Sequence, residues 1–568
     1  MNRIKTIFPI TGWISGYNRG LFKWDLIAGI TLAMFVLPTS MAYASLAGVP
    51  AQYGIYCCIV GGLFFAFFTN IPQIAVGPTS AISLMVGTTV ALLSGGDPGR
   101  WAEIASLTAF IVFILCMAAY FLKLSILVNF ISENILLGFK TGAALSIAVT
   151  QLPKLFAVEG GGNNFFESIY TLCIHLPQTN LTIFLFGLTA LGLLALGNRL
   201  LPGWPISLLI TIGSILVVTY SPLSGCGFQT IGDIPSGLPH FKLPSLHFHD
   251  VDGILELALG CFLVGYIETI TAARIFSEEY GYEINPRHEL LSLGAANFSA
   301  AFASGYPVSG GLSQSTVNDK AGAKTPFALI ICSAALSIIL LYFTGLLKNL
   351  PVIILAVLVL DAVGRLIKIK ELRIVWSLSK FEFSVAIIAI SGVLVFGILK
   401  GVLIAVVTSL IIIIMRASAP NIAILGRIPG TDKFSDIKRH PDNEEIQGCK
   451  IFRIEAAVFY FNQNYIYTRL MELIKGANHD LKLVVLDMSS APGLDISGSK
   501  MLVRLSNELE KMQISFKIVE ALSEVREILR KQGMEKVIGH ISRKVTIINI
   551  ISNFLNPPVY GRDDEILE

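Results

Sequence analysis

Two stretches of the sequence combine Gly, Pro, Ser and Thr in a chain that is otherwise rich in long apolar runs. They are QIAVGPTSAISLMVG (Gln73 to Gly87) and GYPVSGGLSQSTVN (Gly305 to Asn318). Gly and Pro interrupt helices, and interrupted backbone survives at membrane depth only where it is buried in protein or lines a polar cavity. A helix that restarts there presents unpaired N–H groups and a partial positive charge, which favour an anion. The two stretches therefore predict an anion site within a membrane protein.

The composition of the chain is that of a bilayer protein. Of its 568 residues, 54% are hydrophobic and only 14% are charged, so the chain is far more apolar than a soluble domain. A net charge of +3, with no basic tract interleaved with aromatic residues, argues against a nucleic-acid partner. The eight cysteines show no CxxC or Cys/His spacing. We therefore expect no metal site and no cofactor, and composition excludes a soluble enzyme.

The apolar runs predict the number and order of the membrane spans. A spanning helix needs about 20 apolar residues, and windows of that length predict about fourteen spans in two equal sets. Several of these spans are weak or merged, notably the third and the tenth, so hydropathy alone is compatible with roughly ten to fourteen. The third and the tenth of them are the two interrupted stretches. The predicted spans are 26–47, 52–68, 79–93, 104–121, 130–150, 181–198 and 205–219, then 253–272, 288–304, 310–318, 327–344, 346–364, 381–398 and 401–416.

The basic residues in the short loops predict the orientation, because Lys and Arg accumulate on the cytoplasmic side. In a fourteen-span arrangement one side carries most of them, and the other side holds only a few. We therefore expect an integral protein of the cell (inner or plasma) membrane, in contact with the lipid bilayer and with both termini in the cytoplasm. The basic residues on the predicted cytoplasmic side are those of the N-terminal arm, Lys123, Arg199, Arg274, Arg287, Lys320, Lys324, Arg365, Lys368, Lys370, Arg373 and Arg416.

Beyond Arg416 the sequence becomes that of a soluble domain. Residues 418–448 are polar and punctuated by Pro and Gly, which predicts a linker. Apolar runs typical of strands then alternate with amphipathic runs typical of helices, beginning with IFRIEAAVFYF (Ile451 to Phe461). This alternation predicts a small α/β sandwich. It contains no nucleophile elbow or phosphate loop, so a regulatory or structural role is expected of it.

Several long motifs, in order along almost the whole chain, resemble the SulP anion transporters, which carry a C-terminal STAS domain. The STAS domain itself opens on IFRIEAAVFYFNQNY, as is typical of that family. The motifs of the membrane part are LPTSMAYASLAGVPAQYGIY (37–56), VGPTSAIS (76–83), NFISENILLGFKTGAALSIAVTQLPKLF (129–156), GYIETITAARIFSEEYGYEINPRHELLSLGAANFSAAFASGYPVSGGLSQSTVNDKAGAKT (265–325) and NLPVIILAVLV (349–359).

The resemblance implies a polytopic α-helical membrane protein with fourteen segments in two inverted repeats of seven, which form a core domain and a gate domain. It implies that the third and tenth segments are each a short strand followed by a half helix, with the two helix starts facing one another. It also implies a C-terminal cytoplasmic α/β STAS domain, a homodimer and a possible cytoplasmic regulator. The expected parts are an arm (1–25), a transport domain (26–417, with repeats of about 26–202 and 203–417), the linker (418–448), the STAS domain (449–556) and a tail (557–568).

The resemblance also assigns substrate-binding residues, which come from the first, third and tenth segments. The alternative is that the small residues among them only let helices pack closely. Proline and paired glycines favour a site, because close packing does not require them. The expected substrate-binding residues are Thr39, Tyr43, Gly77, Thr79, Ser80, Ala81, Ser309, Gly310, Gly311, Leu312, Ser313 and Gln314.

Glu268 lies in the middle of a span, in LGCFLVGYIETITAAR. An ionisable group there costs at least about 2.5 kcal/mol to insert and is a functional candidate by default. In the family, a carboxylate at this position is associated with coupling to a cation, so we expect Glu268 to bind a coupling proton or sodium ion. The alternative is a structural hydrogen bond to neighbouring hydroxyl or backbone groups.

The chain departs from the family pattern at two places. Many members have Ser-Arg-Ser in the tenth segment, where this chain has Ser313, Gln314 and Ser315, and many have Pro-Gln in the first segment, where it has Pro38 and Thr39. Without the arginine, a site should rely on a co-transported cation or prefer a monovalent anion. We expect secondary active transport of a small inorganic anion by alternating access, with sulfate first. Bicarbonate, dicarboxylates or chloride, and an uncoupled channel or exchanger, remain alternatives.

Overall fold

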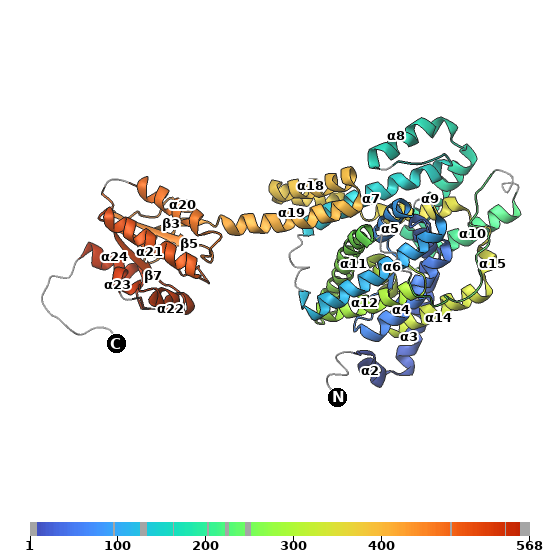
Figure 1. The fold of residues 1–568 in the computed structure, drawn as a ribbon, viewed down its shortest axis with the longest axis horizontal. Coiled ribbons are helices and arrows are strands. Elements are labelled where there is room, and N and C mark those ends of the chain that lie inside the picture. The colour runs from blue at the N-terminus through green and yellow to red at the C-terminus, as the bar shows by residue number, and fades with distance from the viewer. Residues whose placement is uncertain are drawn as a thin grey trace. The chain divides into compact units, whose positions relative to one another are not determined.

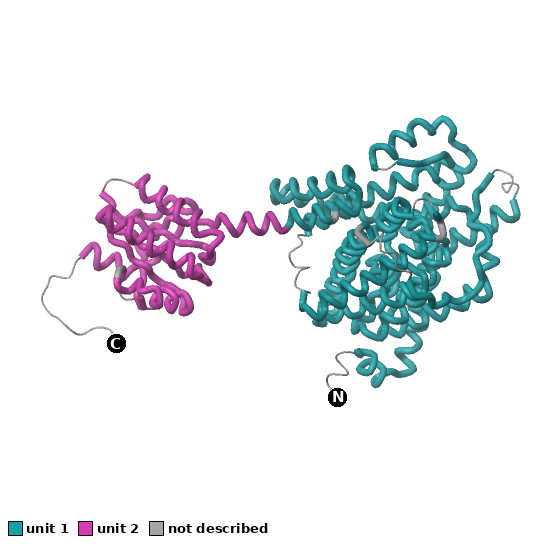
Figure 2. The backbone as a smooth tube through the Cα atoms, in the orientation of Figure 1, with its two compact units in different colours: residues 1–409 teal, residues 410–568 magenta. Residues whose placement is uncertain are grey.

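The computed structural model describes residues 8–94, 97–124, 133–162, 164–201, 204–221, 227–244, 251–477, 480–539, 541–542 and 544–556. The chain divides into two compact units, Met1–Ser409 and Leu410–Glu568 (Figure 2). The division falls within helix α19 (Ile398–Ser418). In the described residues the first unit is helical apart from one pair of two-residue strands, whereas the second contains a five-stranded sheet covered by helices (Figure 1). The expected tail, 557–568, lies outside the described residues.

Fourteen segments in two sets of seven build the membrane part, and the third segment of each set is a short strand followed by a half helix. Two short helices precede them, α2 (Ile10–Trp13) and η1 (Ile14–Gly16). Further short helices lie in the connections: α8 (Phe165–His175), η3 (Leu176–Gln178), α15 (Thr344–Leu347) and α17 (Ile369–Leu378). The first set is α3 (Arg19–Leu46), α4 (Ala51–Phe68), β1 (Val76–Gly77) with α5 (Ser80–Leu93), α6 (Pro98–Phe121), α7 (Glu133–Phe156), α9 (Leu181–Leu200) and α10 (Ile206–Tyr220). The second set is α11 (Val251–Tyr280), α12 (Pro286–Phe302), β2 (Ser309–Gly310) with α13 (Leu312–Lys320), α14 (Phe327–Tyr342), α16 (Val352–Gly364), α18 (Lys380–Phe396) and α19.

The lengths of these helices fit a bilayer. Among the described residues, seven helices are both long and apolar enough to cross a membrane. The remaining segments are shorter or interrupted, as the Gly- and Pro-containing sequence requires. Apolar side chains on α9, α10 and α19 stay uncovered by protein, which suits contact with lipid.

Glycines allow the helices of the membrane part to approach closely. A Cβ on Gly54 of α4 would lie 2.1 Å from the Ser40 carbonyl oxygen of α3, and one on Gly138 of α7 would lie 2.3 Å from the Ala386 carbonyl oxygen of α18. Neither position has room for a larger residue. Close backbone approach at small residues is the usual way in which membrane helices associate.

The second unit is an α/β sandwich with strand order β4-β3-β5-β6-β7. The β3–β4 and β3–β5 pairs are antiparallel, and the β5–β6 and β6–β7 pairs are parallel, as strands joined by crossover helices must be. The strands are β3 (Ile422–Arg427), β4 (Phe434–Asp436), β5 (Cys449–Ile454), β6 (Leu483–Asp487) and β7 (Ser515–Val519), and the helices are α20 (Gln463–Lys475), α21 (Ile496–Lys511), α22 (Ser523–Lys531), α23 (Glu535–Ile538) and α24 (Ile547–Leu555).

Here the structure differs from the expected linker, because residues 418–448 contain the end of α19 and two strands of this sheet. In β3, buried and half-buried residues alternate from Ile422 to Leu425, and Ala423 and Leu425 join the same apolar cluster as Ile451 of β5. The strand has only six residues and is flanked by Pro, Gly and charged residues. Short strands of this kind are hard to recognise in a polar context.

Both faces of the sheet are covered. Successive residues of a strand point to opposite faces, so Phe452 packs in the cluster beneath α20 and α21, and Ile451 packs in the cluster with α24. Asp495 caps α21 by accepting a hydrogen bond from the Gly498 N–H at 2.7 Å. Burial raises the pKa of the Cys449 thiol to about 12, so this cysteine stays protonated within the sheet.

A buried carboxylate near the start of α3 fixes the loop that leads into α14. Asp25 is fully buried and accepts hydrogen bonds from the Lys324 N–H at 2.7 Å, the Thr325 N–H at 3.0 Å and the Thr325 hydroxyl at 2.5 Å. The Tyr17 hydroxyl donates a fourth bond at 3.1 Å. Burial and the Asp25 carboxylate raise the pKa of that hydroxyl above its usual value, so Tyr17 remains a donor. Segments about 300 residues apart in sequence are thereby joined.

We expect Asp25→Ala to lower the stability of the membrane part by about 2 kcal/mol or more, because it leaves buried donors without an acceptor. Thermal denaturation of the purified full-length protein, followed by size-exclusion chromatography, measures this loss. Glu159→Ala is the matched control, because Glu159 is exposed. Equal stability of the two variants would contradict the role given to Asp25.

Candidate anion site

The two interrupted segments meet at the short strands. β1 and β2 pair antiparallel, with Val76 opposite Gly310 and Gly77 opposite Ser309. Each strand leads within a few residues into a helix, α5 from Ser80 and α13 from Leu312. The pairing therefore brings the amino ends of two helices, which are more than 200 residues apart in sequence, to one place in the fold.

Neither helix start is capped by a side chain. The N-cap residues are Thr79 for α5 and Gly311 for α13, and neither provides a side-chain hydrogen bond to the first turn. The first N–H groups of a helix have no partner within the helix. Two such sets of donors, with the positive ends of two helix dipoles, can bind an anion without a full cation.

Hydroxyl groups connect these helix starts to Glu268. The Ser309 hydroxyl donates to the Glu268 Oε2 atom at 2.7 Å, and the Thr79 hydroxyl lies 3.3 Å from the Ser309 hydroxyl. On the next residue of α11, the Thr269 hydroxyl accepts a hydrogen bond from the Gly310 N–H at 2.9 Å. The structure thus brings Glu268 together with Thr79 and Ser309, which come from three different segments.

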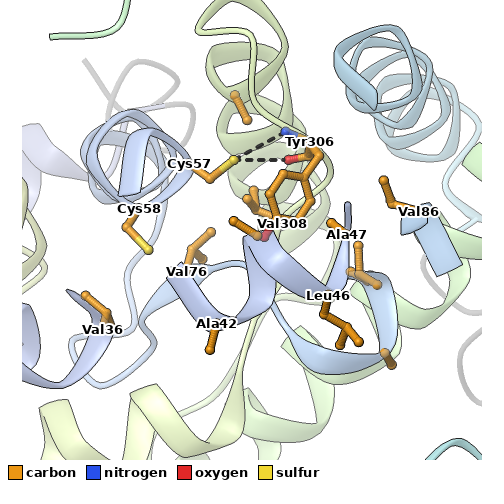
Figure 3. Close-up of a cluster of buried hydrophobic side chains, with 14 of the residues drawn as sticks. Val36, Ala42, Leu46, Ala47, Cys57, Cys58, Val76, Val86, Tyr306 and Val308 are labelled. Atoms are coloured by element: carbon orange, nitrogen blue, oxygen red, sulfur yellow. Dashed lines mark hydrogen bonds between the residues drawn. The ribbon is translucent and has the colours of Figure 1, made fainter. Parts of the chain in front are cut away.

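Buried polar groups hold the strand of the tenth segment. Asn297 of α12 accepts a hydrogen bond from the Val308 N–H at 3.0 Å and donates one to the Val308 carbonyl at 3.1 Å. The Cys57 thiol of α4 lies 3.3 Å from the Tyr306 nitrogen and 3.5 Å from its carbonyl oxygen (Figure 3). Val76 and Val308 lie in the same apolar cluster, so the polar strands are enclosed by hydrophobic side chains (Figure 3).

Gln314 occupies the space that glycines leave open. It is buried, and a Cβ on Gly77 would lie 3.1 Å from its Oε1 atom, whereas a Cβ on Gly311 would lie 2.6 Å from its Nε2 atom. A Cβ on Gly77 would also lie 2.9 Å from the Cys58 Sγ atom, so the two glycines leave room for the side chains of Gln314 and Cys58. Gln314 adds hydrogen-bonding groups to the site, but no charge.

The other expected residues occupy different positions. Ser80 and Ala81 are buried in the first turn of α5, whereas Leu312 and Ser313 are exposed at the start of α13. On α3, Thr39 donates its hydroxyl to the Phe35 carbonyl of its own helix at 2.9 Å. Tyr43, one turn further along α3, is half-buried and lies near Glu268.

A small cavity adjoins Glu268. Its volume is about 30 Å³, enough for about two water molecules, and its wall includes Ala81, Glu268 and Lys140. The remaining wall is apolar and consists of Ile135, Leu136, Phe139, Ala143, Val264, Ile267, Leu366, Ala405 and Val406. Lys140 lies on α7 and was missed by the sequence analysis. The signal was available, since GFKTG places a lysine in a predicted span and ionisable residues there are functional candidates.

The fold and the site define an integral membrane protein with two inverted repeats around paired half helices. The profile of the Sulfate permease family matches residues 22–389, and that of the STAS domain matches residues 440–546. The chain therefore belongs to the sulfate permease family and carries a STAS domain. The family consists of permeases and not of enzymes.

Relatives of similar length support this assignment. A probable sulfate transporter of Mycobacterium tuberculosis is 28% identical, over 96% of this chain and 98% of its own. Probable sulfate transporter 4.2 of Arabidopsis thaliana is 31% identical, over 94% of this chain and 82% of its own. Sulfate transporter 2.1 of the same plant is 30% identical, over 95% and 84%.

Solved structures confirm the predicted fold class. The structure of SLC26A9 superimposes with a TM-score of 0.87 at 20% identity, covering 98% of this chain and 94% of its own. The transmembrane domain of the cyanobacterial bicarbonate transporter BicA superimposes with a TM-score of 0.60 at 20% identity, covering 69% of this chain and 98% of its own. At this level of identity the likeness concerns the fold alone.

Asn297→Ala should destabilise the strand of the tenth segment, because Asn297 holds the residue that precedes it. We expect a loss of about 1–3 kcal/mol, because both polar groups of the buried Val308 peptide lose their partner. Asn349→Ala is the control, since Asn349 forms one exposed hydrogen bond, to Thr219. Thermal unfolding of both variants in detergent measures the difference. An unfolding midpoint of Asn297→Ala equal to that of the control would show that the hydrogen bonds of Asn297 to Val308 are not needed for stability.

Proposed function

We propose that the chain is a secondary active carrier of a small inorganic anion, with sulfate as the first candidate, and that it works by alternating access. The observation that supports this most is the pairing of β1 with β2, which brings two uncapped helix starts together beside Glu268. The relatives from Mycobacterium tuberculosis and Arabidopsis thaliana are named as sulfate transporters, which favours sulfate. The anion binds between the first turns of α5 and α13, at the twelve residues assigned from the sequence, Thr79 and Ser309 first among them.

Glu268 is the proposed site of the coupling ion, a proton or sodium. Its carboxylate accepts the Ser309 hydroxyl, so its charge lies next to the anion site. An ionised carboxylate repels an anion, and binding a proton or sodium ion removes that repulsion. This reciprocal effect on affinity is what couples the two solutes.

We further propose the arrangement in the membrane. Both termini and the STAS domain lie in the cytoplasm, where most basic loop residues are expected. Movement of a core domain against a gate domain exposes the anion site to each side in turn. A homodimer and a cytoplasmic regulator that binds the STAS domain complete the proposal. Its domain limits are those expected from the sequence, except that residues 418–448 contribute two strands to the STAS sheet.

Uptake into proteoliposomes that contain the full-length protein tests the function. We expect saturable uptake of labelled sulfate that an inward proton or sodium gradient drives above equilibrium. Labelled bicarbonate, tested in parallel, addresses the alternative that Gln314 favours, because a site without the family arginine has less fixed charge for a divalent anion. Fast, non-saturating flux that never exceeds equilibrium would instead indicate a channel and contradict the proposal.

Ser313→Trp should abolish uptake but leave the protein folded. Ser313 is exposed at the start of α13, so a bulky side chain is tolerated there but covers the helix start. Lys320→Trp, at the exposed end of the same helix, is the control and should transport normally. If Ser313→Trp elutes as the wild type does and takes up sulfate at the wild-type rate, the anion does not bind at the start of α13.

If the coupling ion is a proton, Glu268→Gln should make uptake independent of external pH. In the wild type, lowering the external pH protonates Glu268 and accelerates uptake, whereas the glutamine is always neutral. Glu256→Gln is the control, because Glu256 is an exposed carboxylate on the same helix. The measurement is the initial rate of sulfate uptake at external pH values between about pH 5 and pH 8. A pH profile of Glu268→Gln that follows the wild type would assign the coupling proton elsewhere.

A further inference from the structure

Lys140 is a cation within the membrane part and lines the cavity that adjoins Glu268. It lies on α7, among the residues Ile135, Leu136, Phe139 and Ala143 that line the same cavity. In the described part of the chain, no carboxylate lies within salt-bridge distance of its ammonium group. A half-buried cation in an apolar wall is costly, and it is retained where a ligand or counter-charge compensates it.

Glu268 is the one carboxylate among the residues that line the cavity together with Lys140. Glu371 and Glu133 are further carboxylates near Lys140. The Glu371 carboxylate forms an exposed salt bridge of 2.7 Å with the Lys368 ammonium group. Lys140 on α7 and Glu268 on α11 are therefore the two charged residues among those that line this cavity.

The other charged groups near the cavity largely neutralise one another. Asp361 and Arg365, whose charges reach Tyr43, form a salt bridge of 2.6 Å. Tyr43 itself is neutral when protonated. The site near Glu268 thus contains a carboxylate that repels an anion and one lysine that can offset it.

The composition of the tenth segment makes this lysine more important. Gln314 stands where many family members have arginine, and its side chain fills the space over Gly77 and Gly311 without adding charge. Helix starts supply only partial charges, about half an elementary charge each. A divalent anion beside Glu268 therefore needs a further cation, and in the described residues around the cavity Lys140 is the one placed to provide it.

We propose that Lys140 is a substrate-binding residue: its ammonium group, reaching the cavity from α7, supplies the full positive charge that holds a small oxyanion beside Glu268 and the starts of α5 and α13. This inference rests on the proposed function. The charge comes from α7, which packs against α16 and α18, whereas the helix starts belong to segments that pack with α11. A bound anion thus contacts both groups of helices.

The test is the concentration dependence of labelled sulfate uptake by full-length protein in proteoliposomes. Lys140→Gln should raise the half-saturating concentration about tenfold or more, and Lys140→Arg should stay within about threefold of the wild type, because it retains the charge. The increase for Lys140→Gln should be smaller for a monovalent anion, nitrate, used as a competitor. Lys154→Gln is the matched control: Lys154 lies on the same helix and is also half-buried, but it donates to Ser45 and does not line the cavity.

A second measurement needs no variant and covers the case in which Lys140→Gln fails to fold. Wild-type protein is treated with an amine-acetylating reagent in saturating sulfate or in a zwitterionic osmolyte, and acetylation is read at each lysine by mass spectrometry. Sulfate should protect Lys140 at least about threefold and leave Lys154 unchanged, since occupancy of a saturated site blocks its lysine.

The outcomes separate this inference from the proposed function. Uptake by Lys140→Gln with a wild-type half-saturating concentration, or acetylation of Lys140 that sulfate does not change, would overturn the role of Lys140 while leaving the carrier intact. A wild-type protein that takes up no sulfate, bicarbonate or nitrate would overturn both. An equal rise of the half-saturating concentration in Lys140→Gln and Lys154→Gln would also overturn the inference. It would indicate that removing either lysine of α7 weakens uptake in the same way.

Discussion

The antiparallel pairing of β1 with β2 is the contact on which the rest of the site depends. Two residues from each strand are enough to place the starts of α5 and α13 together, although they come from opposite halves of the chain. Within a bilayer such backbone must be fully paired or enclosed, and here Asn297, Thr269 and Ser315 supply the side-chain partners. The first N–H groups of both helices lack side-chain caps, and these are the groups left for a ligand.

The surrounding helices serve this pairing. Gly77 and Gly311 make room for Gln314, Cys57 meets the backbone of Tyr306, and the apolar cluster around Val76 and Val308 keeps lipid away from the polar strands. Glu268 adds a carboxylate beside the helix starts, and Lys140 lines the same cavity. A site made of partial charges, one carboxylate and one lysine can respond to a coupling ion through small changes in net charge.

Much of this could be predicted from the sequence. Apolar length predicted roughly ten to fourteen segments, and the resemblance to the family implied fourteen. The interrupted pair was recognised because Pro78 and the Gly310–Gly311 pair stand out in an apolar context. The contact of Glu268 with Ser309 could not be predicted from spacing, since it depends on the crossing of α11 with β2. Lys140 was missed because the residues around it in the sequence are typical of an ordinary span. Its place beside the same cavity as Glu268 depends on how the helices pack. The strands in 418–448 were missed because they are short and surrounded by polar residues.

The most direct test of the central claim is a structure of the full-length protein determined with the anion that it transports, sulfate or bicarbonate, at saturating concentration. The account predicts density for that anion between the first turns of α5 and α13, within hydrogen-bonding distance of their N–H groups and beside Thr79 and Ser309. An ordered anion bound elsewhere in the membrane part, with the two helix starts empty, would contradict it.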